Sequence, residues 1–172
     1  DESKKNNMFF GIPFVAKDNF STKDIPTTGS SNVLNNYVPV YDAEVIVKLK
    51  EQGAILIGKS TLDELAMGGS GTTGHKGTSY NPWDKEHKHL IGGSSCGSAI
   101  SVCDNIVPFA LGSDTGDSVR KPASHGGLVG FKPTWGRISR YGLFPFACSL
   151  DHVGYFTRSV EDSALALNLL AG

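Results

Sequence analysis

Gly92-Gly-Ser-Ser-Cys-Gly-Ser98 and Gly112-Ser-Asp-Thr-Gly-Asp-Ser118 are the two turns around which this sequence is organised. Between them we expect a short helix over 95–104 and a strand in the apolar run 106–111. Glycine accepts backbone conformations that other residues avoid, so such turns can point several N–H groups into one site, beside hydroxyls. A hydroxyl next to converging N–H groups supplies a nucleophile and an oxyanion hole, which acyl transfer requires.

The base for such a nucleophile has to come from elsewhere in the chain, because neither turn contains a histidine and the first one after Ser118 is His125. The candidate is Lys17, which ends the apolar run Phe9–Ala16, a predicted strand. A free lysine, with a pKa of about 10.4, is charged at neutral pH and accepts no proton. Lys17 can act as a base only if burial or a nearby cation lowers its pKa.

These residues together resemble the amidase signature family. The resemblance rests on Lys17 within GIPFVAKDN (11–19), on the GGSS turn (92–95), and on GSDTGDSVR (112–120), in which Ser118 follows Ser94 by 24 residues. It implies an α/β amidase signature fold, with a mixed β-sheet core covered by helices. Family members are much longer, so residues 1–172 would be a single piece of that domain, truncated at both ends.

The resemblance also implies a role for each site residue. Ser118 would be the nucleophile, Ser94 a bridging serine in a cis peptide, and Lys17 the base. The backbone N–H groups of Thr115, Gly116 and Asp117 would form the oxyanion hole, while Asp114 and Arg120 would hold the turn. Judged without the resemblance, a serine in such a turn is more often a helix N-cap.

Three positions depart from the family pattern. Asp117 stands where a glycine usually precedes the nucleophile, Cys96 replaces a glycine of the first turn, and His125-Gly126 replaces an aromatic-Cys pair. A carboxylate beside an oxyanion disfavours it unless the carboxylate points away. These departures bear on rate and substrate range more than on the class of reaction.

One branch of the family fits best. GFKPTWGRISRYGL (130–143) and ACSLDH (147–152) are similar to the A subunits of glutamyl/aspartyl-tRNA amidotransferases. Such a subunit hydrolyses glutamine and delivers ammonia within a complex with subunits B and C, where a partner subunit uses ATP and Mg²⁺ to amidate misacylated Glu-tRNA(Gln) or Asp-tRNA(Asn). This chain itself would need no cofactor and no metal. The alternative within the family is a stand-alone amidase acting on a small carboxamide.

Composition limits the other classes. The net charge is −1 and no basic stripe is visible, so this chain alone should not bind tRNA strongly. Three cysteines at irregular spacing argue against a disulfide framework or a zinc site and fit a reducing, cytoplasmic setting. No apolar run is long enough to predict a membrane segment.

Two rival functions remain open. Gly93-Ser-Ser95-Cys-Gly97 matches the G-x-S-x-G elbow of α/β-hydrolases, with Ser95 as nucleophile and His152 as a later histidine, but His89-Leu-Ile is a poor preceding strand. The second rival is a non-catalytic scaffold that keeps the fold without activity.

Two further motifs have ordinary explanations. A dinucleotide-binding pattern, G-x-G-x-x-G, occurs at Gly69-Ser-Gly-Thr-Thr-Gly74, but a predicted helix precedes it and a loop follows, whereas the motif needs a strand before it and a helix after it. The stretch 81–90, which carries His87 and His89, is interpreted as a solvated loop in preference to a metal site with His75 as a third ligand.

The remaining elements follow from periodicity and turn signals. We expect a loop over 21–41, then a helix capped by Asp42 and ended by Gly53, with Val45, Ile46 and Leu49 on its apolar face. A strand over 54–57 should pair in parallel with the first. Further expected elements are helical segments at 61–67 and 117–124, a strand at 127–131, a loop at 134–150, and a helix capped by Ser159.

Overall fold

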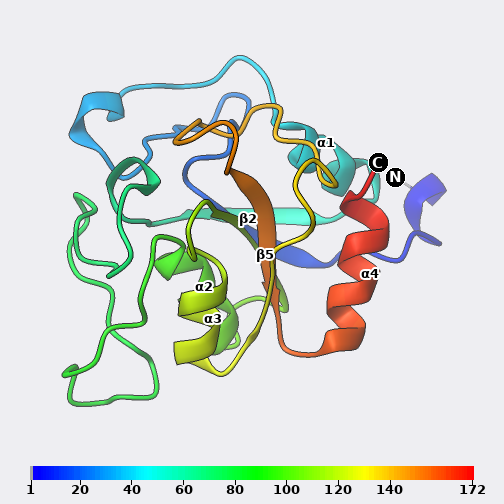
Figure 1. The fold of residues 1–172 in the computed structure, drawn as a ribbon. Helices are drawn as coiled ribbons and strands as arrows, with labels where there is room; N and C mark the ends of the chain where they lie inside the picture. Colours follow the sequence, from blue (N-terminus) through cyan, green and yellow to red (C-terminus); the bar gives the residue numbers. More distant parts are fainter. Residues whose placement is uncertain (1) are drawn as a thin grey trace.

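A five-stranded mixed sheet forms the centre of the molecule in the computed structural model, which describes residues 2–172 (Figure 1). The strands are β1 (Pro13–Lys17), β2 (Ile55–Ser60), β3 (Phe109–Asp114), β4 (Val129–Phe131) and β5 (His152–Thr157). Their order in the sheet is β2-β1-β3-β5-β4. β1 pairs in parallel with β2 and β3, whereas β5 pairs antiparallel with β3 and β4. The predicted mixed sheet and the parallel first pair are confirmed.

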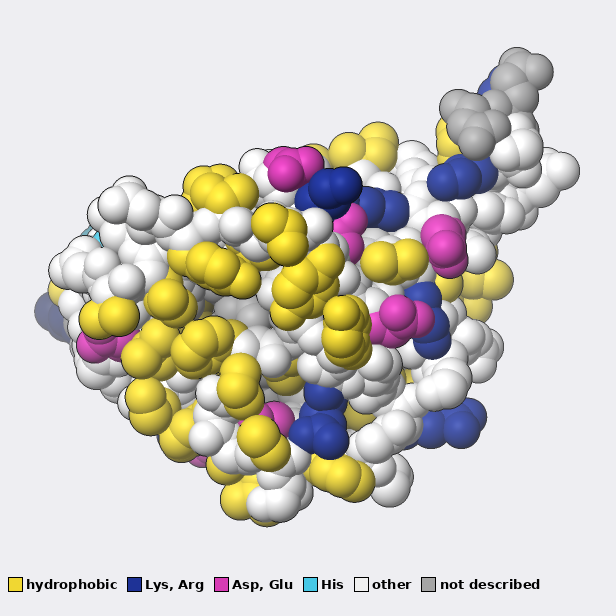
Figure 2. Space-filling model, turned by 90° about the horizontal axis from the view of Figure 1, so that it is seen from above, with side chains coloured by type: hydrophobic (Ala, Val, Ile, Leu, Met, Phe, Trp, Pro, Cys, Tyr) yellow, Lys and Arg dark blue, Asp and Glu magenta, His cyan; other side chains and the backbone are white. Residues whose placement is uncertain are grey.

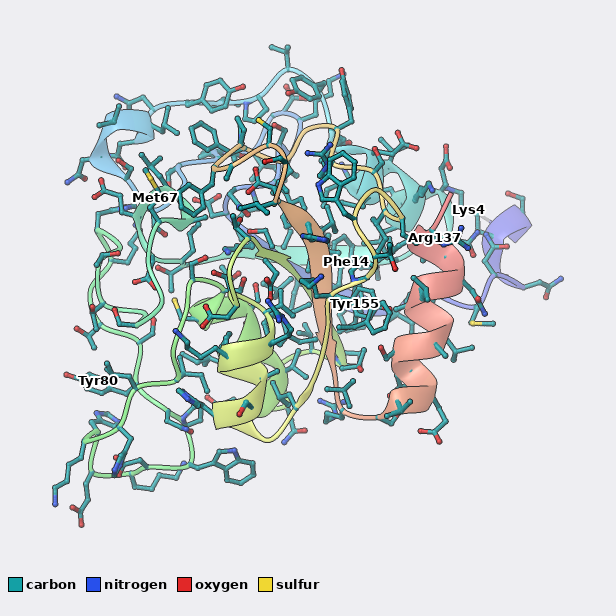
Figure 3. All side chains as sticks on the ribbon, in the orientation of Figure 1. Lys4, Phe14, Met67, Tyr80, Arg137 and Tyr155 are labelled. Carbon is teal, nitrogen blue, oxygen red and sulfur yellow. The ribbon has the colours of Figure 1, made fainter. Side chains whose placement is uncertain are left out.

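Helices cover both faces of this sheet. α1 (Glu44–Glu51) and α4 (Val160–Leu170) pack on one face, and α2 (Cys96–Cys103) and α3 (Arg120–Gly126) on the other. Side chains alternate across a strand, so Phe14 joins the first core and Val15 the second. Figure 3 labels two residues of the first core, Phe14 and Tyr155, in the middle of the molecule. The fold is therefore three-layered, and the central strands β1, β3 and β5 are buried on both sides.

α1 forms the predicted crossover between β1 and β2. Its buried face carries Val45, Ile46 and Leu49, as expected, and Gly53 follows its end with a φ of 82°. The predicted cap is wrong. The N-cap residue is Ala43, and the Asp42 carboxylate instead accepts a hydrogen bond from the Lys23 N–H and pairs with Lys50 at 2.7 Å. The carboxylate that was expected to cap the helix therefore accepts its hydrogen bond from the backbone N–H of Lys23, which is distant in sequence.

α4 begins at the predicted cap. The Ser159 side chain accepts a hydrogen bond of 3.0 Å from the Asp162 N–H, and Glu161 and Asp162 lie in the first turn. Ser159→Ala should lower the free energy of unfolding by about 1 kcal/mol, because it leaves that helix N–H without its acceptor. Urea denaturation would measure the loss. Ser159→Asn, which can cap equally well, is the control and should stay near the wild-type value.

β5 is absent from the sequence-based expectations. It is almost entirely buried, so its sequence, HVGYFT, lacks the apolar–polar alternation that marks a half-buried strand. It also contains Gly154, a residue that strands usually avoid. The structure explains the glycine, because a Cβ there would lie 2.5 Å from the Phe131 carbonyl oxygen of the neighbouring strand.

The predicted helix over 61–67 is wrong. Only a short 3₁₀ turn, Glu64–Ala66, forms there, and Leu65 and Ala66 have φ values of 52° and 64°. The Leu65 N–H donates to the Gly29 carbonyl at 2.8 Å, a tertiary contact that replaces the helical bond. Other predicted bounds shift by a few residues: β1 starts after a turn at 9–12, β2 runs to residue 60, and α3 starts at residue 120.

Figure 2 looks down on the upper part of Figure 1, where the loops after β1 and before β5 run. Hydrophobic side chains gather on this face. The exposed large apolar residues of those two loops are Ile25, Val33, Tyr37, Val38, Val40, Tyr41, Trp135, Tyr141, Phe144, Phe146 and Leu150. Within residues 2–172, none of the helices combines the length and hydropathy that crossing a membrane requires.

Candidate active site

The site forms where the parallel strands β1 and β3 end side by side. Their parallel register pairs Ala16 with Leu111, so the carboxyl ends of both strands lie at the same edge of the sheet. There the Lys17 Nζ atom lies 2.7 Å from Ser94 Oγ, 2.9 Å from Ser113 Oγ and 3.3 Å from the Ser113 carbonyl oxygen. The structure therefore brings Lys17 and Ser94 into direct contact, although they are 77 residues apart in sequence.

Lys17 has no exposed surface. Burial lowers its pKa from 10.5 to about 7, and the nearby Cys96, Asp114, Asp63 and Asp151 only partly oppose this shift. A large fraction of Lys17 is thus neutral at pH 7, with a lone pair that can accept a proton. The burial that the sequence analysis required of this residue is present.

The first turn places Ser94 through a cis peptide between Gly93 and Ser94, as the resemblance implied. Two backbone hydrogen bonds hold this turn: the Gly93 N–H donates to the Gly69 carbonyl at 2.9 Å, and the Ser94 carbonyl accepts from the Asp63 N–H at 3.1 Å. Ser94 is completely buried. Its hydroxyl is therefore fixed below the surface, facing the amine of Lys17.

The second turn carries Ser118. Its carbonyl oxygen accepts a hydrogen bond from the Ser95 N–H at 3.2 Å, which ties the two turns together. The hydroxyl of Ser118 makes no hydrogen bond to another residue of 2–172, and neither do the four consecutive N–H groups of residues 115–118. Ser118 is not the N-cap of α3, which is Val119. The turn thus presents a hydroxyl and a set of uncommitted donors, although no hydrogen bond joins the side chains of Ser94 and Ser118.

Asp114 and Arg120 close this turn. The Arg120 guanidinium donates to both carboxylate oxygens of Asp114, at 3.0 and 3.2 Å, and also to the Gly116 carbonyl. The Val119 N–H donates to Asp114 at 2.9 Å. Burial alone would raise the pKa of Asp114, but these hydrogen bonds outweigh it and keep that pKa below its ordinary value. The pair sets the shape of the turn, while its charges are satisfied by each other.

Two of the unusual residues have simple surroundings. The Asp117 carboxylate forms an ion pair of 2.8 Å with Lys121, four residues later on α3, which compensates its charge. Cys96 is the first residue of α2 and is buried in the second core, and burial raises the pKa of its thiol. Neither residue therefore places an uncompensated negative charge at the Ser118 hydroxyl.

Three further residues of the site were not found from the sequence. The Ser113 hydroxyl contacts Lys17 and accepts a hydrogen bond of 2.9 Å from the Asn19 side-chain amide. The buried Asp151 accepts a bond of 2.6 Å from the Thr115 hydroxyl and also bonds the N–H groups of Phe146 and Ala147. The adjacency of the β1 and β3 ends could have indicated Ser113 and Asn19, since Ser113 is the last residue but one of β3 and Asn19 follows β1 by two residues.

A family model described as Amidase matches residues 1–172. The chain belongs to the amidase family. It is 53% identical over 167 residues to the A subunit of the glutamyl-tRNA(Gln) amidotransferase of Oenococcus oeni, and the match covers 97% of this chain and 34% of that protein. A relative from Sulfurihydrogenibium with the same description is 55% identical over 163 residues, covering 95% of this chain and 33% of that protein.

Solved structures agree with the amidase fold. The crystal structure of the glutamyl-tRNA(Gln) amidotransferase A subunit from Thermotoga maritima superposes with a TM-score of 0.93 and is 48% identical, covering 98% of this chain and 37% of that one. The peptide amidase of Stenotrophomonas maltophilia superposes with a TM-score of 0.90 at 37% identity, covering 95% of this chain and 34% of that one. The predicted fold class is confirmed, and the chain spans about a third of the length of these relatives.

In this member of the amidase family, the elbow alternative loses its structural basis. Leu90 forms only an isolated bridge with Tyr80, so no strand of residues 2–172 leads into the first turn. Ser95 is fully buried, and its hydroxyl donates to the Ser113 carbonyl at 3.1 Å. His152 lies on β5, with its ring bonded to the Leu150 carbonyl. Ser95 therefore links α2 to β3.

The histidines of the predicted solvated loop do not converge. His89 pairs with Asp84 at 2.8 Å, and His87 stacks on Tyr80 with 5.0 Å between the ring centroids. Tyr80 lies at the far left of Figure 3, away from the sheet. Over residues 2–172, no cluster of His, Cys, Asp and Glu side chains has the arrangement of a metal site.

Proposed function

We propose that this chain carries an amide-hydrolysing centre in which Lys17, Ser94 and Ser118 act as base, relay and nucleophile. The observation that carries the proposal is the buried contact of 2.7 Å between the Lys17 amine and the Ser94 hydroxyl. A lysine with a pKa of about 7 supplies a base at neutral pH, where an ordinary lysine would not.

The proposed reaction starts with proton transfer. Neutral Lys17 takes the proton of the Ser94 hydroxyl as Ser94 takes that of Ser118, and the Ser118 oxygen attacks the carbonyl carbon of a carboxamide. The N–H groups of Thr115, Gly116 and Asp117 would stabilise the resulting oxyanion; one such donor typically contributes about 100- to 1000-fold in rate. The relay then returns the proton to the departing nitrogen, the C–N bond breaks, and ammonia leaves. Water attacks the acyl-enzyme and releases the acid.

We further propose glutamine as the amide donor, with the ammonia used for tRNA amidation in a complex with B and C subunits. The support is the identity of about half of all aligned positions to proteins described as the A subunit of glutamyl-tRNA(Gln) amidotransferase. In such a complex the partner subunit would bind ATP and Mg²⁺ and the complex would engage misacylated Glu-tRNA(Gln) or Asp-tRNA(Asn). A cytoplasmic location belongs to the same proposal. The stand-alone amidase is the alternative.

Treatment of the folded chain with a fluorophosphonate, followed by peptide mapping, tests the nucleophile. We expect one adduct, on Ser118, formed at a rate that rises with pH and levels off above about 7, because only neutral Lys17 can accept the proton. Ser118→Ala should abolish the adduct. An adduct on Ser95, or none on a chain shown to be folded, would contradict the proposal.

Ammonia release from glutamine tests the substrate. We expect release to increase when the B and C subunits and misacylated tRNA are added to the chain. Hydrolysis of small carboxamides that is indifferent to those additions would favour the stand-alone amidase. Acylation of Ser118 without turnover of either substrate would indicate a scaffold.

A further inference from the structure

Asp63 is a buried carboxylate with an unusual number of donors around it. It has no exposed surface. Its two oxygens accept hydrogen bonds from three successive backbone N–H groups, those of Gly71 at 2.8 Å, Thr72 at 2.9 Å and Thr73 at 3.1 Å, and from the Thr73 hydroxyl at 3.0 Å. A carboxylate with this many partners holds its loop firmly, because each charge-assisted bond is stronger than a neutral one.

The same residue holds the turn that carries Ser94. The Asp63 N–H donates to the Ser94 carbonyl, and the Gly93 N–H donates to Gly69 in the loop that the carboxylate organises. Contact is also direct, because a Cβ on Gly93 would lie 2.1 Å from an Asp63 oxygen and 3.0 Å from the Gly71 nitrogen. Asp63 therefore lies between loop 69–74 and the Gly93–Ser94 turn, and binds both.

We propose that Asp63 is a positioning residue, which fixes loop 69–74 against the Gly93–Ser94 turn and so holds the Ser94 hydroxyl against the Lys17 amine. The glycine-rich motif at 69–74 then has a structural reason: its backbone wraps a carboxylate of the protein itself. The functional part of this inference rests on the proposed roles of Lys17 and Ser94.

Asp63 also acts on Lys17 through its charge. The groups that raise the pKa of Lys17 against the effect of burial are Cys96 on α2, Asp114 at the end of β3, Asp63, and Asp151 before β5. Removing the Asp63 charge should therefore lower the pKa of Lys17 further. A purely structural role would leave that pKa unchanged, so the two roles differ in a measurable way.

The test compares Asp63→Asn with Asp84→Asn in the whole chain. Asp84 is a matched control, because its carboxylate also accepts three backbone N–H groups, those of Glu86, Lys88 and His89, but in the loop that contains Tyr80 and away from Lys17. Three quantities are measured: the rate of fluorophosphonate reaction at Ser118 against pH, amide hydrogen exchange at residues 71–73, and the pKa of Lys17 by NMR of its side chain.

For Asp63→Asn we expect the maximum rate to fall by about 10- to 100-fold, as small misplacements of a catalytic group do. The midpoint of the pH profile should move to lower pH, and exchange at residues 71–73 should accelerate. Asp84→Asn should change none of these. Unchanged exchange at residues 71–73, or a maximum rate equal to that of the wild type, would overturn the positioning role, and an unmoved midpoint would overturn the effect of the Asp63 charge on Lys17.

Two outcomes need separate readouts. If the wild-type chain is folded but Ser118 does not react, the proposed function fails in this chain. The exchange data and the NMR titration then still test whether Asp63 holds loop 69–74 and raises the pKa of Lys17. If Asp63→Asn does not fold, Thr73→Val removes one donor and keeps the charge. It should accelerate exchange at residues 71–73 by about 2- to 10-fold, the range for one hydrogen bond, and reduce the maximum rate without moving the midpoint. Unchanged exchange in that variant would overturn the proposal.

Discussion

Lys17→Met should abolish acylation of Ser118 and, in the same protein, raise the free energy of unfolding at pH values below about 7. The loss of reaction follows because methionine has no lone pair that could take the Ser94 proton. The gain in stability follows because wild-type folding buries a group that is protonated at those pH values, whereas methionine is apolar and of similar length.

The sign and size follow from proton linkage. The pKa of Lys17 is about 7 in the folded chain against 10.5 for an ordinary lysine, so the folded state binds the proton less tightly than the unfolded state. The resulting destabilisation is complete below pH 7, shrinks as the pH rises from there, and vanishes above 10.5. It amounts to about 5 kcal/mol at most. Loss of the hydrogen bonds to Ser94 and Ser113 removes about 1 kcal/mol each, leaving a net gain of about 3 kcal/mol.

Urea denaturation of both proteins on either side of neutral pH would measure this difference. The advantage of the variant should decrease as the pH rises above 7. Lys88→Met is the control, since the Lys88 side chain is 70% exposed. The difference in stability between Lys88→Met and the wild type should not change with pH. A Lys17→Met protein that is less stable than wild type at every pH would mean that Lys17 is buried as a satisfied cation.

Gly93→Ala is expected to be among the most damaging single-methyl additions in the chain. The added Cβ would lie 2.1 Å from an Asp63 carboxylate oxygen and 3.0 Å from the Gly71 nitrogen, and neither is free to move away. Asp63 is held by four hydrogen bonds, and Gly71 is one of its donors. Overpacking of this kind costs about 1–3 kcal/mol and occasionally more. The reaction of Ser118 should be lost with it, because the displaced turn carries Ser94.

The matched control is Gly58→Ala, the same substitution on β2. A Cβ at Gly58 meets nothing within 4 Å and the residue does not have a positive φ. That variant should equal or exceed the wild type in stability, since it only reduces the freedom of the unfolded chain. Thermal denaturation of both variants would measure the contrast. Equal stability of Gly93→Ala and Gly58→Ala would show that the Asp63 loop can give way.

Sequence patterns predicted the elements whose formation is local. The apolar face and terminal glycine of α1, the Ser159 cap of α4 and the short helix after the first turn all depend on residues close in sequence, and all three formed. The motif residues Lys17 and Ser94 could be paired in advance only through the family resemblance. Their spacing of 77 residues contains no sign that their side chains meet.

Prediction failed where a distant partner decided the outcome. The Asp42 carboxylate accepts a hydrogen bond from the Lys23 N–H and does not cap the helix that follows it. In the 61–67 segment, the Leu65 N–H donates to the Gly29 carbonyl and not to a carbonyl of its own helical turn. β5 was missed because burial on both faces removes the apolar–polar alternation of a half-buried strand. Its Gly154 is required by the close approach of the Phe131 carbonyl on the neighbouring strand. Ser113 and Asn19 belong to the site only because β1 and β3 end together. In each case the information lies in the tertiary arrangement.

The order of the strands has a consequence for the chain during its synthesis. β1 is made before β3, which pairs beside it, and Ser113 of β3 follows Lys17 by 96 residues. At roughly 5–20 residues per second, the nascent chain spends about 5–20 seconds with β1 made and β3 unmade. Throughout that interval Lys17 is an ordinary hydrated ammonium group. The Lys17 side chain loses its hydration as β3 pairs with β1, so its pKa falls only when the centre of the sheet has formed.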